Sequence, residues 1–467
     1  MLNNDLSDAM KKQVEKLVEK IGNDSIVANI TMTFTSPKFP EYKVYLCREI
    51  QSLSIHQDFV KNITDKITAE LLLEKDTYVG MLYMRKNLFC QLEITFVHPE
   101  QVFDNNQYKR KPDYSEKFKV MLTKWEDLFK KFSTEQLFPE KRRENASDHK
   151  LFNMSIELLM DDVFKARKQA FYITGRDTTM KQMVRYVINY FGFKKAHIST
   201  ISNTKQYTNF VIPPAYGVEE VMSYLQNGPG LGIFKDGLIS YIQNHCWYVY
   251  PRYGEPLNKC PIHVYCLGGG RFEGMSRNDW EEGSQTASPV TGKFPLHIIS
   301  PFEMKEDSWI SKGTENEYTS IVAHMSDLVI DASRTLVNDE KTVLNRNTHY
   351  PTVVPPDIMD YDNFIRIKHV KSHGNLFKLC SEARSLQCRT LSFKWKHARP
   401  WVFQPATAVY VHYDDHGKMD EGLGICEMAD YTFTRDKEGR TEPVWTCEGN
   451  FDICCSVRGE KLTQSKR

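Results

Sequence analysis

Residues 172–251 constrain the fold more than any other part of the chain, because they hold the only long run of consecutive helix signals. An apolar stripe follows Asp177 and Thr178, either of which can accept a hydrogen bond from a free first-turn amide, and it ends at Gly192. The stripe consists of Met180, Met183, Val184, Val187 and Phe191. This helical spacing predicts a helix from 178 to 191.

The remainder of this stretch mixes extended and helical signals. Two prolines within 211–214 bias their predecessors to extended geometry, so no helix is expected there. Helices are predicted at 218–226 and 238–244, where apolar residues share one face. The aromatic run at 247–250 predicts a short buried strand, which Pro251 ends.

Sequence on either side alternates apolar and polar residues with a period of two, which is typical of strands. The clearest case has apolar residues at Leu88, Cys90, Leu92, Ile94 and Phe96. Further strands are predicted at 28–34, 42–46, 65–74, 152–158, 391–395, 407–413, 424–433 and 444–457. Between polar loops, 120–132 has helix-like spacing instead. A meander with one buried face is typical of an antiparallel sandwich or barrel.

The predicted fold class is therefore α+β and mainly β, with two small antiparallel β-barrel domains, an inserted helical α/β domain and long decorating loops. A length of 467 residues fits several domains of about 100–200 residues each. The predicted parts are an N-terminal helical arm at 1–24, a first β domain at 25–172 with an insertion at 100–150, the helical α/β domain at 173–267, a long connection at 268–365 and a second β domain at 366–467.

Charge and cysteine content exclude some classes of protein. The 61 basic and 60 acidic residues leave a net charge of +1, whereas a domain that coats nucleic acid is usually clearly basic. The eleven cysteines are odd in number and irregular in spacing, which indicates folding in a reducing cytoplasm. No apolar run approaches the roughly 18 residues of a membrane span, so no stable membrane insertion is expected.

One cysteine and histidine triplet has the spacing of zinc ligands. Cys260, His263 and Cys266 are each three residues apart. They lie on an alternating strand, however, which would not point all three side chains to one face, and only His245-Cys246 is a candidate fourth ligand. We therefore expect no metal site here.

Glycine clusters and acidic pairs have non-catalytic explanations. The clusters at 228–232 and 268–270 lack the Lys-Ser/Thr of a phosphate loop, so turns or close backbone approach are favoured. The pairs Asp161-Asp162, Asp414-Asp415 and Asp420-Glu421 stand at strand ends beside turn residues, where solvated turns or contacts between subunits are favoured. No nucleophile and base grouping is present in the sequence pattern. We expect no catalytic residue and no cofactor, and hence no enzyme.

The order of elements around the helical stretch resembles that of the baseplate hub proteins of contractile-tailed phages. Residues 155–162 end the first β domain and lead, through Phe171 to Ile173, into the capped helix at 178–191. An extended Val-Ile-Pro-Pro segment at 211–214 and the aromatic strand at 247–250 follow. The hub family takes this route out of its first tube domain.

The C-terminal quarter resembles the second tube domain of the same family. A helix predicted at 375–387 precedes a strand at 391–395, a turn flanked by prolines, a strand at 407–413 and two closing strands that reach Val457. The two resemblances together cover roughly half of the chain.

The resemblance implies a structural virion protein of the phage tail baseplate, folded in the host cytoplasm. Three chains with two tube domains each would form a homotrimeric ring that joins a sixfold tail tube to a threefold central spike. DNA would pass through its lumen during ejection without sequence-specific binding, and the partners would be the tail tube protein, the spike and the tape-measure protein. The alternatives are a structural tail or virion module without hub geometry, and a hydrolase with its site in the helical domain.

Overall fold

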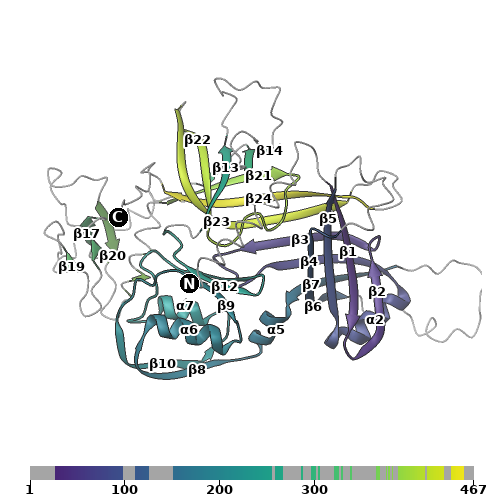
Figure 1. Cartoon of the computed structure of the whole chain (residues 1–467), viewed down its shortest axis with the longest axis horizontal. Coiled ribbons are helices and arrows are strands. Elements are labelled where there is room, and N and C mark those ends of the chain that lie inside the picture. Colours follow the sequence, from purple (N-terminus) through teal and green to yellow (C-terminus); the bar gives the residue numbers. More distant parts are fainter. Residues whose placement is uncertain are drawn as a thin grey trace, which may run out of the picture.

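The computed structural model describes residues 27–97, 111–125, 151–254, 388–415, 418–435 and 443–456, with short strands between 258 and 368 and the residues Asn375, Phe377, Lys378 and Ser381. These residues form a mostly β structure with four α-helices. One fifteen-stranded sheet, here called the β body, lies beside a helical region at 171–254 (Figure 1). No helix in the described ranges is long and apolar enough to cross a membrane.

The β body contains a closed ring of paired strands. In ring order these are β1 (Val27–Ser36), β5 (Phe89–Val97), β6 (Tyr114–Trp125), β7 (Leu151–Met160), β4 (Lys66–Glu74), β3 (Ile50–Asp58), β23 (Lys418–Arg435) and β24 (Trp445–Ser456). The ring closes where Ala28 of β1 pairs with Trp445 of β24. The N-terminal strands β1 and β3 are thus hydrogen-bonded to the C-terminal strands β24 and β23 in one sheet.

Period-two alternation explains why these strands form a ring with a filled interior. In β5, Cys90, Leu92 and Ile94 are fully buried while the residues between them are half-buried. They face buried residues of β1, including Met32 and Phe34, and all belong to one hydrophobic core. The same core continues into the helical region, so the two parts pack as one molecule.

The C-terminal strands extend the sheet beyond the ring. The first half of β23 pairs with β22 (Thr407–Asp415), and its second half pairs with β3. The sheet continues through β13 (Asn258–Cys266), β15 (Leu296–Ser300) and β14 (Gln285–Ala287), and on the other side through β21 (Cys388–Lys396) and β16 (Glu303–Lys305). Because one sheet contains strands from both predicted β domains, the expectation of two separate barrels is not confirmed.

Several short elements decorate this sheet. The strand β2 (Phe39–Leu46) branches from β1, and α2 (Lys75–Met84), the 3-10 turn η1 (Arg85–Asn87) and α5 (Asp161–Arg167) connect ring strands. Two further pairs join β17 (Ser320–His324) to β20 (Phe364–Lys368) and β18 (Leu328–Val329) to β19 (Val337–Asn338). Two basic residues, Lys165 and Arg167, stand in the last turn of α5.

The helical region is built on two small sheets. An antiparallel ribbon of β8 (Phe171–Thr179) and β10 (Gln206–Tyr216) accompanies α6 (Met180–Tyr190). A second sheet holds β11 (Ile239–Gln243), β12 (Cys246–Tyr250) and β9 (Lys195–Ile198), and α7 (Val221–Asn227) lies in the chain between β10 and β11. The cap of α6 is Thr179, which forms a capping box with Gln182, so the predicted cap at Asp177 or Thr178 is wrong. Asp177, two residues before Thr179, has a left-handed φ of 49°.

Two helix predictions are wrong within the described residues. Residues 238–244 are the strand β11, because this short apolar run pairs with β12 across a two-residue turn. In 120–132, the part up to Trp125 belongs to β6, which is held between β5 and β7, so the tertiary ladder overrides the helix-like spacing. The extended segment at 211–214 and the strand at 247–250 are confirmed.

Other expectations lie wholly or mostly outside the described residues. These are the helical arm at 1–24, the glycines at 268–270 and most of the connection at 268–365. Of the helix predicted at 375–387, residues 375, 377, 378 and 381 are described; the last three are helical and Asn375 is not.

Candidate functional site: the junction of the β body and the helical region

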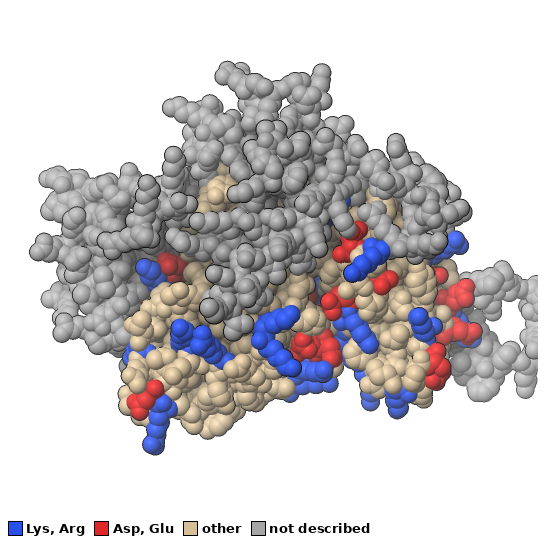
Figure 2. Space-filling model, in the orientation of Figure 1, with Lys and Arg blue, Asp and Glu red and all other residues tan. Residues whose placement is uncertain are grey.

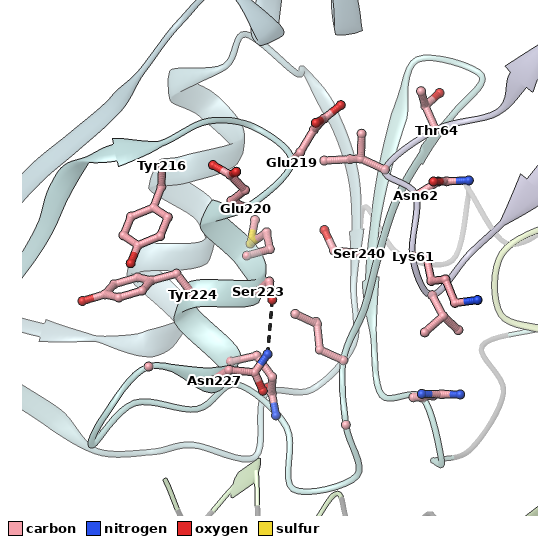
Figure 3. Close-up of a pocket in the computed structure, with 18 of the residues that line it drawn as sticks. Lys61, Asn62, Thr64, Tyr216, Glu219, Glu220, Ser223, Tyr224, Asn227 and Ser240 are labelled. Atoms are coloured by element: carbon pink, nitrogen blue, oxygen red, sulfur yellow. Dashed lines mark hydrogen bonds between the residues drawn. The ribbon is translucent and has the colours of Figure 1, made fainter. Parts of the chain in front are cut away.

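A cleft of about 850 Å³ separates the β body from the helical region. The loop from Val60 to Lys66, between β3 and β4, lines one side, and α7 with Tyr216 lines the other (Figure 3). Lys61, Asn62 and Thr64 lie across the cleft from Glu219 and Glu220. The junction therefore presents mixed charge rather than a field of one sign.

The side chains of the cleft are already engaged with one another. Tyr216 and Tyr224 stack with ring centroids 4.3 Å apart, and the Asn227 amide donates to Ser223 Oγ at 3.2 Å. Arg167 of the α5 end forms an ion pair with Glu219 at 2.7 Å. The described residues of the lining include neither histidine nor cysteine, so they offer no imidazole base for a serine nucleophile.

Beneath the cleft, the Asp65 carboxylate accepts hydrogen bonds from four side chains. Oδ1 accepts from the Tyr241 hydroxyl at 2.6 Å, and from the side-chain amides of Gln57 and Gln243 at 3.0 and 3.4 Å. Oδ2 accepts from Trp401 Nε1 at 2.8 Å. Burial raises the pKa of Asp65, although the four hydrogen bonds act in the opposite direction.

These four donors come from three separate parts of the chain. Gln57 belongs to β3, Tyr241 and Gln243 to β11, and Trp401 to the segment that precedes β22. Leaving a buried acceptor without donors costs about 1–3 kcal/mol of folding free energy. The Asp65 carboxylate therefore stabilises the positions of all three parts that donate to it. Asp65 therefore connects the ring, the helical region and the C-terminal segment.

Trp401 is held in an unusual backbone conformation. Its φ is 65°, in the left-handed region that non-glycine residues occupy at a cost of order 1–2 kcal/mol. Its indole stacks on Tyr114 of β6 with ring centroids 3.7 Å apart and an interplanar angle of 11°. The hydrogen bond to Asp65 and this stacking contact compensate for the backbone cost.

Backbone contacts supplement the carboxylate at this junction. The amide of Ile242 in β11 donates to the carbonyl of Ile63 at 2.6 Å, and Thr64 forms a parallel bridge with Ile242. These contacts attach the loop between β3 and β4 to the edge of the small sheet of the helical region.

A buried ion pair links the end of the helical region to β23. Arg252 Nε and Nη2 donate to the two carboxylate oxygens of Glu427 at 2.5 and 2.9 Å. Glu427 is 7% exposed and lies at the bulge between Cys426 and Met428, which turns its side chain out of the ladder. Its carbonyl also accepts from the Phe59 amide at 2.9 Å.

The glycine cluster at 228–232 is a turn with close backbone approach, as predicted. Gly230 and Gly232 have φ values of 68° and 141°, and a Cβ on Gly232 would lie 2.2 Å from the Phe377 ring. Beside it, the Asn375 amide donates to the carbonyls of Gln226 and Gly228 at 2.6 and 2.8 Å. The cluster thus packs against Asn375 and Phe377.

The structure separates the other residues that the sequence singled out. Asp161 pairs with Lys165 at 2.6 Å, and Asp162 contacts His245, so both belong to contacts at the start of α5. Cys260, His263 and Cys266 lie on β13, but their side chains fall outside the described residues, as do those of Asp414, Asp415, Asp420 and Glu421. Within the described part, no group of three histidine, cysteine, aspartate or glutamate side chains is arranged to hold a metal ion.

Sequence reasoning missed Asp65, Glu427 and Trp401. Asp65 stands at the start of the strand predicted at 65–74, and its donors are far apart in sequence. Glu427 interrupts the apolar run of β23, which is the one local signal that could have marked a buried charge.

Comparison with known proteins yields matches among solved structures alone. No family model and no curated protein matches the chain. One match is a tail protein from Neisseria meningitidis MC58, with a TM-score of 0.44 and 10% identity, covering 91% of this chain and 96% of that one. Another is the 43 kDa tail protein of prophage MuSo2 from Shewanella oneidensis, with a TM-score of 0.42 and 8% identity, covering 91% and 98%.

A third match is the E. coli c3393 protein, described as a component of the type VI secretion system with structural similarity to the T4 tail proteins gp27 and gp5. Its TM-score is 0.33 and its identity 6%, covering 87% of this chain and 73% of that one. All three TM-scores are below 0.5, which is too low to establish a shared fold.

Proposed function

We propose that the chain is a structural subunit of a phage tail baseplate, and that three copies form a hub ring between the tail tube and the central spike. The observation that carries this proposal is the sheet that joins both ends of the chain. β23 pairs with β22 in its first half and with β3 in its second half, so no hinge separates the two β portions. A wall made of such subunits transmits load through backbone hydrogen bonds.

The character of the junction also supports a structural role. Asp65 and the pair of Arg252 and Glu427 are engaged with fixed partners, and the cleft above them lacks an imidazole in its described lining. In the hub, DNA passes through the lumen without sequence-specific binding. A near-zero net charge suits that task, because a strongly basic wall would retain phosphates.

An exposed aromatic edge is the candidate contact between copies. Among the described strands, β2 is bonded to β1 alone, so its outer edge is open to a further strand. Tyr45 on β2 and Tyr83 on α2 are 59% and 75% exposed, and the rings of Phe39 and Tyr83 lie 6.1 Å apart. Open edges with exposed aromatic rings are suited to association.

The oligomeric state of the full chain tests the ring. Native mass measurement is expected to give three times the mass of one chain for the protein alone, or three copies of it in each complex with tail tube and spike proteins. Negative-stain images are expected to show a ring with a lumen. A strictly monomeric chain under all of these conditions would overturn the hub and leave a tail module without hub geometry.

A matched pair of variants tests the aromatic edge separately. Tyr83→Lys, combined with Tyr45→Lys, is expected to weaken the trimer, whereas Tyr186→Lys on the exposed face of α6 is expected to leave it intact. If both variants lose the trimer equally, or if neither loses it, then β2 and α2 are not part of the interface, although the ring itself could still form through other surfaces.

A further inference from the structure

The hairpin of β11 and β12 has a tip that points a histidine at the β body. Asn244 and His245 both have left-handed φ values, 50° and 59°, as the central residues of a two-residue type I′ turn require. From this tip, His245 reaches Asp162 of α5 and Glu116 of β6. The contact joins the helical region to two elements of the β body.

Both nitrogens of the His245 ring face a carboxylate oxygen. Nδ1 lies 2.6 Å from Oδ2 of Asp162, and Nε2 lies 3.3 Å from Oε1 of Glu116. A neutral imidazole carries one N–H and can satisfy one of these acceptors, and its other nitrogen would then present a lone pair to a carboxylate. Only the doubly protonated imidazolium donates to both.

The surroundings of this contact favour the charged form. Partial burial lowers the pKa of His245, but its hydrogen bonds to Asp162 and Glu116 and their negative charges outweigh it, so the pKa is raised above its ordinary value. The neighbouring Asp161 is paired with Lys165, a separate contact on α5. Figure 2 shows acidic and basic side chains gathered over α5, where the two parts of the molecule meet.

We propose that His245 is a pH-sensitive latch that fastens the β11–β12 hairpin to α5 and β6. When protonated, it donates to Asp162 and Glu116 at once. When pH rises, the His245 ring releases one proton to solvent and one of the two hydrogen bonds is lost. The nitrogen that lost its proton then presents a lone pair to the carboxylate it had bonded. The strand β11 then remains attached through Tyr241 to Asp65 and through Ile242 to Ile63, so the turn loosens while the strand stays in place.

The sense of the pH dependence follows from the raised pKa. The latch is fully formed below the pKa of an unfolded histidine, about 6.5. It weakens as pH rises through the higher pKa of the folded protein. The charged groups that face His245 are Asp162 from α5 and Glu116 from β6, and both are acidic, so both act in this direction.

Histidine-selective NMR on the full chain tests the latch directly. The resonance that disappears in His245→Asn identifies the residue, and asparagine tolerates the left-handed turn conformation, so this variant keeps the hairpin. In the wild type, its titration midpoint is expected above that of a histidine in an unstructured peptide. Asp162→Asn is expected to lower the midpoint more than Glu116→Gln, because its contact is shorter.

Hydrogen exchange supplies the structural readout and Asp161→Asn the matched control. Exchange of the tip, relative to β4, is expected to rise with pH in the wild type and to lose this dependence in His245→Asn. Asp161→Asn removes the neighbouring ion pair with Lys165 and is expected to leave the midpoint unchanged. A midpoint at or below that of the peptide, or equal exchange in the wild type and His245→Asn across the range, would overturn the latch.

Discussion

The C-terminal strands and the helical region are attached to the first β strands in different ways. β23 joins β3 through a six-residue register of paired residues, from Met428 to Phe433, and β24 closes the ring on β1. The helical region is attached to the ring by a shared apolar core, by side chains at Asp65, at His245 and in the Arg252–Glu427 pair, and by one bridge at Ile242. A ladder separates only when strands unfold, whereas side-chain contacts can be broken singly. The first junction should therefore behave as part of the global fold, and the second as an adjustable contact.

The largest effect is expected from the ladder junction. Phe433 of β23 is 1% exposed and pairs with Leu53 of β3. Phe433→Ala is expected to lower the free energy of unfolding by about 3–5 kcal/mol, through lost burial and the cavity left behind. Denaturant unfolding should show one transition moved to a lower midpoint. The exposed neighbour Thr434→Ala is the control, with a change within about 0.5 kcal/mol.

A second transition in Phe433→Ala, with the helical region unfolding separately, would contradict the view that the ladder holds the global fold. The helical region would then be a unit that unfolds independently of the ladder.

The side-chain junction should respond less strongly and more locally. Asp65→Ala removes the acceptor of Tyr241, Trp401 and Gln57, and is expected to cost about 1–3 kcal/mol, with faster hydrogen exchange in β11 than in β4. Asp65→Asn keeps one acceptor oxygen and should recover part of the loss. Equal protection of β11 in the wild type and Asp65→Ala would show that Asp65 does not hold the helical region.

The difference between the two junctions also explains what the sequence could predict. The alternation of Leu92 and Ile94 in β5 is a local signal, since a half-buried strand repeats every two residues. That β24 reaches Ala28 is not local, because the pairing depends on residues more than 400 positions apart. The run at 238–244 was too short to separate helix from strand, and its pairing with β12 decided the outcome.

Stability inside the helical region can be lowered without touching either junction. Thr179 accepts from the Gln182 amide and forms the capping box of α6. Thr179→Ala is expected to cost about 1 kcal/mol, whereas the exposed Thr208→Ala on β10 should cost less. Thermal unfolding would measure both. An unchanged midpoint in Thr179→Ala would show that α6 depends on its apolar face alone.

The smallest effect is expected from a titrating pair inside the ladder junction. His56 of β3 lies opposite Asp430 of β23, and their hydrogen bond is the main cause that raises the pKa of His56. Because the folded pKa is raised, the stabilisation is present below about pH 6.5 and is lost as pH rises through the folded pKa. Both side chains are about one-third exposed (37% and 35%), so the pair should contribute no more than about 1 kcal/mol.

The measurement compares the His245→Asn protein with the double variant that also carries His56→Gln, so that the latch does not contribute. The difference in their unfolding free energies is determined at pH 5.5 and at pH 8. That difference should shrink at the higher pH, while hydrogen exchange at the β11–β12 tip stays the same in both chains. A tip that loosens when His56 is replaced would mean that the ladder and the side-chain junction are coupled, and the two attachments would no longer be independent.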